Sequence, residues 1–136
     1  MTAKQWLNRA RRIDREIRAL EEVISSTRKR LESVTQSYSG DGAQSSKDPH
    51  KFDRLVELES LVNEKIDEQI QIKTEILEAI SQIRDRRQRI VLTEYYLNMK
   101  TWEQVAVEIN YSWRQVMNIH GRALQEMQRI ISLNFI

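Results

Sequence analysis

The chain has 136 residues, of which 40% are hydrophobic and 31% charged, with no cysteine and a formal net charge of +2. This composition is too apolar for a fully disordered chain, and it excludes disulfides and thiolate metal sites. No apolar run approaches the roughly 18 residues that a membrane span needs, and the first residues lack the apolar core of a secretory signal. We therefore expect an intracellular protein without membrane contact.

Charge is distributed unevenly along the chain. Residues 1–38 carry nine Lys and Arg against five acids, residues 39–85 carry six against eleven, and residues 86–136 carry seven against four. The middle is therefore acidic and both ends are basic. A basic end is compatible with a nucleic-acid partner, although the excess here is modest.

The first segment predicts one long helix. Thr2 and Gln5 have capping-box spacing at its start, and Gly40 and Gly42 end it. The helix would span about 35 residues, roughly 50 Å. Its apolar or neutral residues recur in alternating steps of four and three, which is the heptad pattern of a coiled-coil seam. These residues are Trp6, Ala10, Ile13, Ile17, Leu20, Ile24, Thr27, Leu31 and Val34.

A polar connection and a second long helix follow. Small polar residues and glycines predict a flexible loop at about 38–49, and Asp48 before Pro49 suits a helix cap. The second helix is expected from about residue 50 to 84. Its apolar stripe is broader than a strict heptad, so it can touch more than one neighbour. The stripe consists of Phe52, Leu55, Val56, Leu58, Val62, Ile66, Ile70, Ile72, Ile76, Leu77, Ile80 and Ile83.

Two long helices joined by a short polar loop are expected to pack as an antiparallel coiled-coil hairpin over residues 1–85. With the turn near residue 44, the basic residues 28–30 come opposite the acids at 57 and 59, and the arginines at 9, 11 and 12 come opposite the acids at 75 and 78. Exposed pairs contribute only about 0.2–1 kcal/mol each, so they select the register. The basic run from Arg9 to Arg18 is interpreted as a solvated face of the hairpin rather than a second DNA site. Because a two-helix hairpin has a thin core, we expect either a dimer through the hairpin, which is favoured, or packing against the C-terminal segment.

Residues 86–136 predict a second domain of three short helices. The helices are expected at Arg86 to Asn98, at Trp102–Ile109 and from Trp113 to about Ile131. Residues 98–100 form the first turn, and Asn110, which tolerates the left-handed conformation, fits the second. The tail from Ile130 is apolar for a chain end, and we expect it to dock on the hairpin or on a partner subunit.

The strongest feature of the sequence is a pair of helix-start patterns eleven residues apart. Thr101 with Gln104 and Ser112 with Gln115 both have capping-box spacing. Two short helices joined by a tight turn form a helix-turn-helix, whose second helix can lie in a DNA major groove. We expect Ala106 to be the small residue where the helices cross. The core beneath them should contain Val105, Ile109, Val116 and Ile119.

The opposite face of the second helix would then project toward DNA. Arg can bond guanine bidentately, Asn can bond adenine, and apolar groups can touch the thymine methyl. Arg122 and Lys100, with Arg86, Arg87 and Arg89 as further candidates, suit phosphate contacts. The residues predicted to bind DNA are Ser112, Trp113, Arg114, Gln115, Met117, Asn118, Arg122 and Lys100.

Other interpretations of these residues stay open. Trp113 is equally suited to a core or interface, and Met117 can simply pack. Tyr95, Tyr96 and Trp102 are expected in the core of the three-helix domain. His50 and His120 lack the further ligands that a metal site needs, so we expect surface or partner-facing histidines and no metal or cofactor.

Residues 89–124 resemble region 4 of bacterial sigma factors. The resemblance rests on the tyrosine-rich helix, on Thr101-Trp-Glu, on Ser112 followed by Val116, and on Arg122-Ala-Leu. It implies binding to a promoter element and contact with RNA polymerase. Over nearly its whole length the chain resembles small phage and prophage proteins of Gram-positive bacteria that carry such a domain, and related phage proteins activate late-gene transcription. This resemblance implies a cytoplasmic protein of a bacterial host cell. Trp113 and Met117 stand where the family commonly has charged residues, so its sequence preference does not carry over.

These observations lead to an all-α chain that acts as a sequence-specific DNA-binding transcription regulator. No Gly-rich phosphate loop, catalytic cysteine or His-Glu-x-x-His motif occurs, so we expect no enzyme. Two alternatives stay open. One is a coiled-coil structural or adaptor protein, and the other is a small-terminase-like DNA packaging protein.

Overall fold

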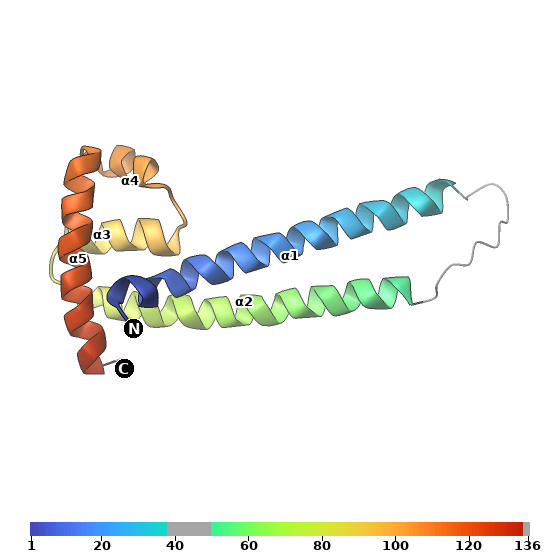
Figure 1. The fold of residues 1–136 in the computed structure, drawn as a ribbon, viewed down its shortest axis with the longest axis horizontal. Coiled ribbons are helices and arrows are strands. Elements are labelled where there is room, and N and C mark those ends of the chain that lie inside the picture. Colours follow the sequence, from blue (N-terminus) through green and yellow to red (C-terminus); the bar gives the residue numbers. More distant parts are fainter. Residues whose placement is uncertain (38–49, 135–136) are drawn as a thin grey trace. The chain divides into compact units, whose positions relative to one another are not determined.

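The computed structural model of the chain (Figure 1) describes residues 1–37 and 50–134, and all the secondary structure in these ranges is helical. The all-α expectation is therefore confirmed for the described residues. Among them, no helix is both long and apolar enough to cross a membrane. The predicted loop at 38–49, with its Asp48–Pro49 cap, lies outside the described residues. The elements are α1 (Ala3–Ser37), α2 (Lys51–Ser81), α3 (Arg86–Leu92), η1 (Thr93–Leu97), α4 (Trp102–Ile109) and α5 (Trp113–Asn134).

The chain divides into two compact units. The terminal unit consists of Met1–Ile13 with Gln69–Ile136, and the middle unit is Asp14–Glu68. Both α1 and α2 contribute residues to each unit. This division differs from the predicted domain boundary at residue 85, because the first turns of α1 and the last turns of α2 share a core with the C-terminal segment.

In the middle unit, α1 and α2 run antiparallel (Figure 1). Glu16 pairs with Lys65 at 3.7 Å, and Arg28, further along α1, pairs with Glu59, which lies earlier on α2. The Arg28–Glu59 pair confirms the register expected there. The predicted seam faces inward in this unit, since Ile17 and Ile24 of α1 and Leu55 and Val62 of α2 are buried. Val34 lies outside the residues whose side chains the structure describes.

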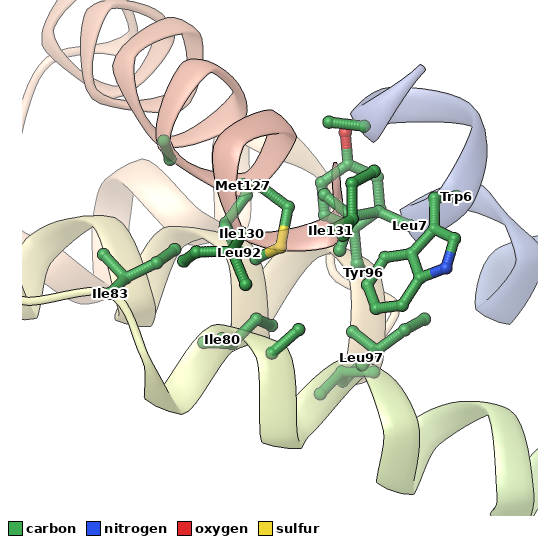
Figure 2. Close-up of a cluster of buried hydrophobic side chains, with 14 of the residues drawn as sticks. Trp6, Leu7, Ile80, Ile83, Leu92, Tyr96, Leu97, Met127, Ile130 and Ile131 are labelled. Atoms are coloured by element: carbon green, nitrogen blue, oxygen red, sulfur yellow. The ribbon is translucent and has the colours of Figure 1, made fainter. Parts of the chain in front are cut away.

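The terminal unit holds the larger core (Figure 2). The start of α1 meets the end of α2 there, together with α3, η1 and the second half of α5. The predicted packing of the long helices against the C-terminal segment is thereby confirmed, and so is the docking of the tail at Ile130 and Ile131. The backbone N–H of Ala3 also donates to Oε1 of Gln128 at 2.8 Å, which ties α1 to α5. The labelled side chains in Figure 2 are Trp6, Leu7, Ile80, Ile83, Leu92, Tyr96, Leu97, Met127, Ile130 and Ile131.

Side-chain caps define the helix starts. The capping boxes at residues 2–5, 101–104 and 112–115 are all confirmed, with both reciprocal hydrogen bonds between 2.8 and 3.2 Å. Asp85 caps α3 as well, although this cap is not among the sequence predictions: its Oδ1 accepts from the N–H of Arg87 at 2.8 Å. Burial opposes ionisation of Asp85, but the N–H groups of Gln88 and Arg87 lower the pKa of its carboxyl. These caps fix where the short helices begin.

The helix expected from Arg86 to Asn98 changes character midway. After Leu92 the chain widens into the π-helical turn η1, whose end is marked by the N–H of Asn98 donating to the carbonyl of Thr93 at 3.0 Å. Turns of this kind insert one extra residue into a helix and rotate the side chains that follow. Here Tyr96 and Leu97 turn into the core.

Candidate nucleic-acid interface

The site is built on α4, α5 and the turn between them. Asn110 adopts the left-handed conformation, with φ 60° and ψ 43°, and its N–H donates to the carbonyls of Ala106 and Val107. The N–H of Tyr111 donates back to the carbonyl of Ala106 at 3.1 Å. This pattern closes α4 and lets α5 start two residues later. The two helices and the turn residue therefore lie where the sequence predicted them.

A small apolar cluster holds α4 and α5 together. Val105 of α4 and Val116 of α5 are fully buried, and Ala106, Ile109 and Ile119 pack against them. The predicted core of this helix pair is confirmed. Val91 of α3 belongs to the same buried cluster, so α3 packs against both α4 and α5.

The opposite face of α5 carries three exposed polar side chains, those of Arg114, Asn118 and Arg122. None of them forms a hydrogen bond or ion pair with any described residue. From Trp113 to Gln125 the helix contains no acid. This outward strip is therefore free for a partner.

The other residues near the start of α5 that are predicted to bind DNA differ in their exposure and in their contacts. Trp113 has an exposed fraction of 56%, which is high for an indole. Met117 is half-buried and packs against the Val91–Val105–Val116 cluster, so packing accounts for it. Ser112 and Gln115 are exposed, but their side chains bond each other's backbone N–H groups in the cap. These two residues position the helix start.

Lys100 lies between two carboxylates. Its ammonium pairs with Glu94 and with Glu108. The hydrogen bonds to Glu108 and then Glu94 raise the pKa of Lys100, and the Lys100 ammonium lowers the pKa of Glu94. A phosphate contact, as predicted for Lys100, has to compete with both carboxylates. The sequence alone does not show these ion pairs, because Glu94 lies in η1, Lys100 in the connection after it and Glu108 in α4.

Two of the three arginines near the start of α3 face solvent. Arg86 and Arg87 are exposed and line an open hollow of about 650 Å³ beside Ile109 and Tyr111. A hydrogen bond with the Tyr111 hydroxyl and the charge of Asp85 raise the pKa of Arg87. Tyr111 directly precedes the cap of α5, so Arg87 lies at the edge of the proposed interface. Arg89 instead donates from Nη1 to the carbonyls of Ile83 at 2.7 Å and Arg84 at 2.8 Å, in the connection between α2 and α3.

Four rings, those of Tyr95, Tyr96, Trp102 and His120, pack together and connect η1, α4 and α5. Tyr95 stacks on Trp102 with centroids 3.7 Å apart, and the Trp102 ring lies 4.5 Å from that of His120. The Tyr96 hydroxyl lies 2.8 Å from Nε2 of His120. The expected core roles of the two tyrosines and the tryptophan are confirmed. The expected exposure of His120 is wrong, because only 9% of this residue is exposed.

Arg11 of α1 contacts this group of rings at Tyr95. Its Nη1 donates to the carbonyl of Tyr95 at 2.5 Å and to that of Lys100 at 3.3 Å, and its guanidinium lies 4.0 Å from the Tyr95 ring centroid. The register expected from the sequence puts Arg11 opposite the acids of the second helix, and this prediction is wrong. Its neighbour Arg9 does pair with Glu75, at 3.4 Å.

Comparison with protein-family models, with curated proteins and with solved structures finds no match to this chain.

Proposed function

We propose that this chain is a sequence-specific DNA-binding transcription regulator, in which α4 and α5 act as a helix-turn-helix and α5 enters the major groove. The observation that carries the proposal is the outward strip of Arg114, Asn118 and Arg122, exposed and without partners among the described residues. The buried side of the same helix is held by the apolar cluster under Val116. A rigid helix with a free, acid-free polar face is what groove recognition needs.

The residues on the strip differ in chemistry, and their roles differ accordingly. Arg114 and Asn118 lie in the first turns of α5, the part of a recognition helix that reaches base edges, where they suit guanine and adenine. Trp113 offers an apolar surface to a thymine methyl or to the backbone. Arg122 and Arg87 suit phosphates, which fix the orientation of the protein without reading sequence.

Selection of bound fragments from random duplex DNA with the purified chain tests the proposal. The double variant Arg114→Ala/Asn118→Ala should bind the selected duplex at least about tenfold more weakly for each lost contact. Its far-UV circular dichroism should equal that of the parent, because both side chains are exposed. The matched control Arg15→Ala/Asn63→Ala removes the same two side-chain types from exposed positions of α1 and α2, and it should bind like the parent.

The same experiment separates the alternatives. If the chain recovers no duplex, the interpretation as a structural or adaptor protein replaces the proposal. If the Arg15→Ala/Asn63→Ala variant loses affinity instead, the basic run on α1 is the DNA site. A packaging protein would also bind DNA through such a motif, and a second measurement distinguishes it. A transcription regulator should change transcription from a promoter that carries the selected duplex, whereas a packaging protein should not.

We further propose that the middle unit mediates a dimer. Val23, Phe52, Val56 and Leu61 are large apolar side chains of this unit with exposed fractions between 39% and 61%. Burial of such side chains against a second copy would remove them from water. Light scattering of the intact chain should then give twice the monomer mass, and a monomer would contradict this part of the proposal. Contact with RNA polymerase, which the resemblance implies, is not needed for DNA binding by the purified chain.

A further inference from the structure

Gly121 occupies a position where the protein itself has no need for glycine. It lies in the interior of α5, it is exposed, and no heavy atom lies within 4 Å of the position that a Cβ would take. Its φ is not positive, so the backbone conformation at this position does not require glycine. After proline, glycine is the least favourable residue in a helix interior. Neither backbone conformation nor internal packing therefore explains its presence.

The position of Gly121 on α5 coincides with the proposed interface. Residues 114, 118 and 121 follow in steps of four and three, so they share one face of the helix. Arg122, exposed and without a partner among the described residues, is the next residue. A partner that meets this face therefore finds positive charge beside a point where the helix backbone is uncovered.

The distance along the helix indicates which part of a duplex would lie there. Seven residues separate Gly121 from Arg114, which corresponds to about 10 Å along the helix axis. The major groove is about 12 Å wide. If Arg114 reaches base edges, Gly121 lies near the wall of the groove, where the sugar-phosphate backbone runs.

We propose that Gly121 is the point of closest approach between α5 and the DNA backbone, and that Arg122 binds the phosphate there. The inference rests on the proposed function of α5. The missing Cβ lets the sugar-phosphate chain come closer than any side chain would permit, a recurrent use of glycine at ligand contacts. Gly121 thereby sets how deeply α5 enters the groove.

Substitution at Gly121 gives opposite effects on folding and on binding. Gly121→Ala should raise Tm by a few degrees, because alanine favours the helix and meets open space, yet it should weaken binding to the duplex selected with the parent chain. Gly121→Leu should weaken binding by about tenfold or more, the size of a lost specific contact. The slope of log K against log salt, which is negative, should also become less steep by about 0.9, because one phosphate contact is lost.

A matched control places the same leucine side chain elsewhere. Ala19→Leu places an isobutyl group at an exposed position of α1, and it should bind like the parent. If Gly121→Leu binds as tightly as the parent while Arg114→Ala/Asn118→Ala does not, this inference is overturned and the proposed function stands. If the parent itself binds no duplex, both are overturned.

Discussion

The hydroxyl of Tyr96 and Nε2 of His120 lie 2.8 Å apart in the core of the terminal unit, which joins η1 to α5 through a buried polar contact. Burial, with a smaller contribution from the charge of Lys4, lowers the pKa of His120 to about 4. Burial also raises the pKa of Tyr96. Both groups are therefore neutral near pH 7, and each depends on the other as its hydrogen-bond partner.

The depressed pKa of His120 predicts a loss of stability in acid. An unfolded histidine titrates near about 6.5, so between that pH and about 4 the unfolded chain binds the proton more readily than the folded chain. The contribution of neutral His120 is fully present above pH 6.5 and is lost as the pH falls toward 4. The free energy of unfolding should decline by at most about 3 kcal/mol from this group.

Urea denaturation between pH 4 and 7 measures this decline. Asp85, Glu94 and Glu126 also have lowered pKa values, so acid weakens the fold through them as well. The informative quantity is the difference between the parent and His120→Gln, which should shrink as the pH falls. His50→Gln alters an exposed histidine and should follow the parent. A parent–His120→Gln difference that is constant with pH would contradict the prediction.

The Tyr96 hydroxyl can be removed without changing the ring. Tyr96→Phe leaves Nε2 of His120 buried without a partner, which should cost about 1–3 kcal/mol of unfolding free energy. Tyr95→Phe is the matched control, because the Tyr95 hydroxyl makes no hydrogen bond with any described residue. Chemical denaturation at pH 7 should rank Tyr96→Phe well below Tyr95→Phe. Equal stabilities would show that the 2.8 Å contact contributes nothing.

The sequence predicted those parts of the fold that depend on residues close together in the chain. The heptad spacing from Trp6 to Leu31 and the three capping boxes are local patterns. In the structure, the first lies within the single helix α1, and the capping-box hydrogen bonds are all present. The Asp85 cap was also visible, since Gln88 follows it three residues later. The inward position of His120 could have been read from its spacing, because residues 116, 120, 123 and 127 form one heptad stripe and are all buried.

Contacts between distant residues were not predictable in this way. Tyr96 lies 24 residues from His120, and Arg11 lies 84 residues from Tyr95. A hairpin register alone placed Arg11 opposite the second helix, since nothing local shows that the C-terminal segment packs against the start of α1. For the same reason, the sequence predicts the residues of the interface by their side-chain chemistry but not the contacts that each of them makes. The engagement of Lys100 with two carboxylates and the open space at Gly121 appeared only in three dimensions.

The contacts of Arg11 predict a stability effect that its neighbour lacks. Arg11→Ala removes two hydrogen bonds to carbonyls and the contact with the Tyr95 ring, and should cost about 2–3 kcal/mol. Arg11→Lys should recover only part of this, because a lysine cannot reproduce the planar fork. Arg12 is exposed, and Arg12→Ala should change the unfolding free energy by less than about 0.5 kcal/mol. Similar losses for Arg11→Ala and Arg12→Ala, measured by denaturation, would contradict this role.

Lys100 and Arg122 were both predicted to bind phosphate, and their surroundings now predict different behaviour. Arg122 is exposed and without a partner among the described residues, so its replacement by alanine should make the negative slope of log K against log salt less steep by about 0.9. Lys100 already neutralises Glu94 and Glu108. Lys100→Ala should leave the slope nearly unchanged, and it should lower Tm by separating the turn after η1 from α4. Binding measured from low to moderate salt on the selected duplex distinguishes the two. If Lys100→Ala also makes the slope of log K against log salt less steep by about 0.9, Lys100 binds a phosphate after all. The DNA would then replace Glu94 and Glu108 as partners of the Lys100 ammonium.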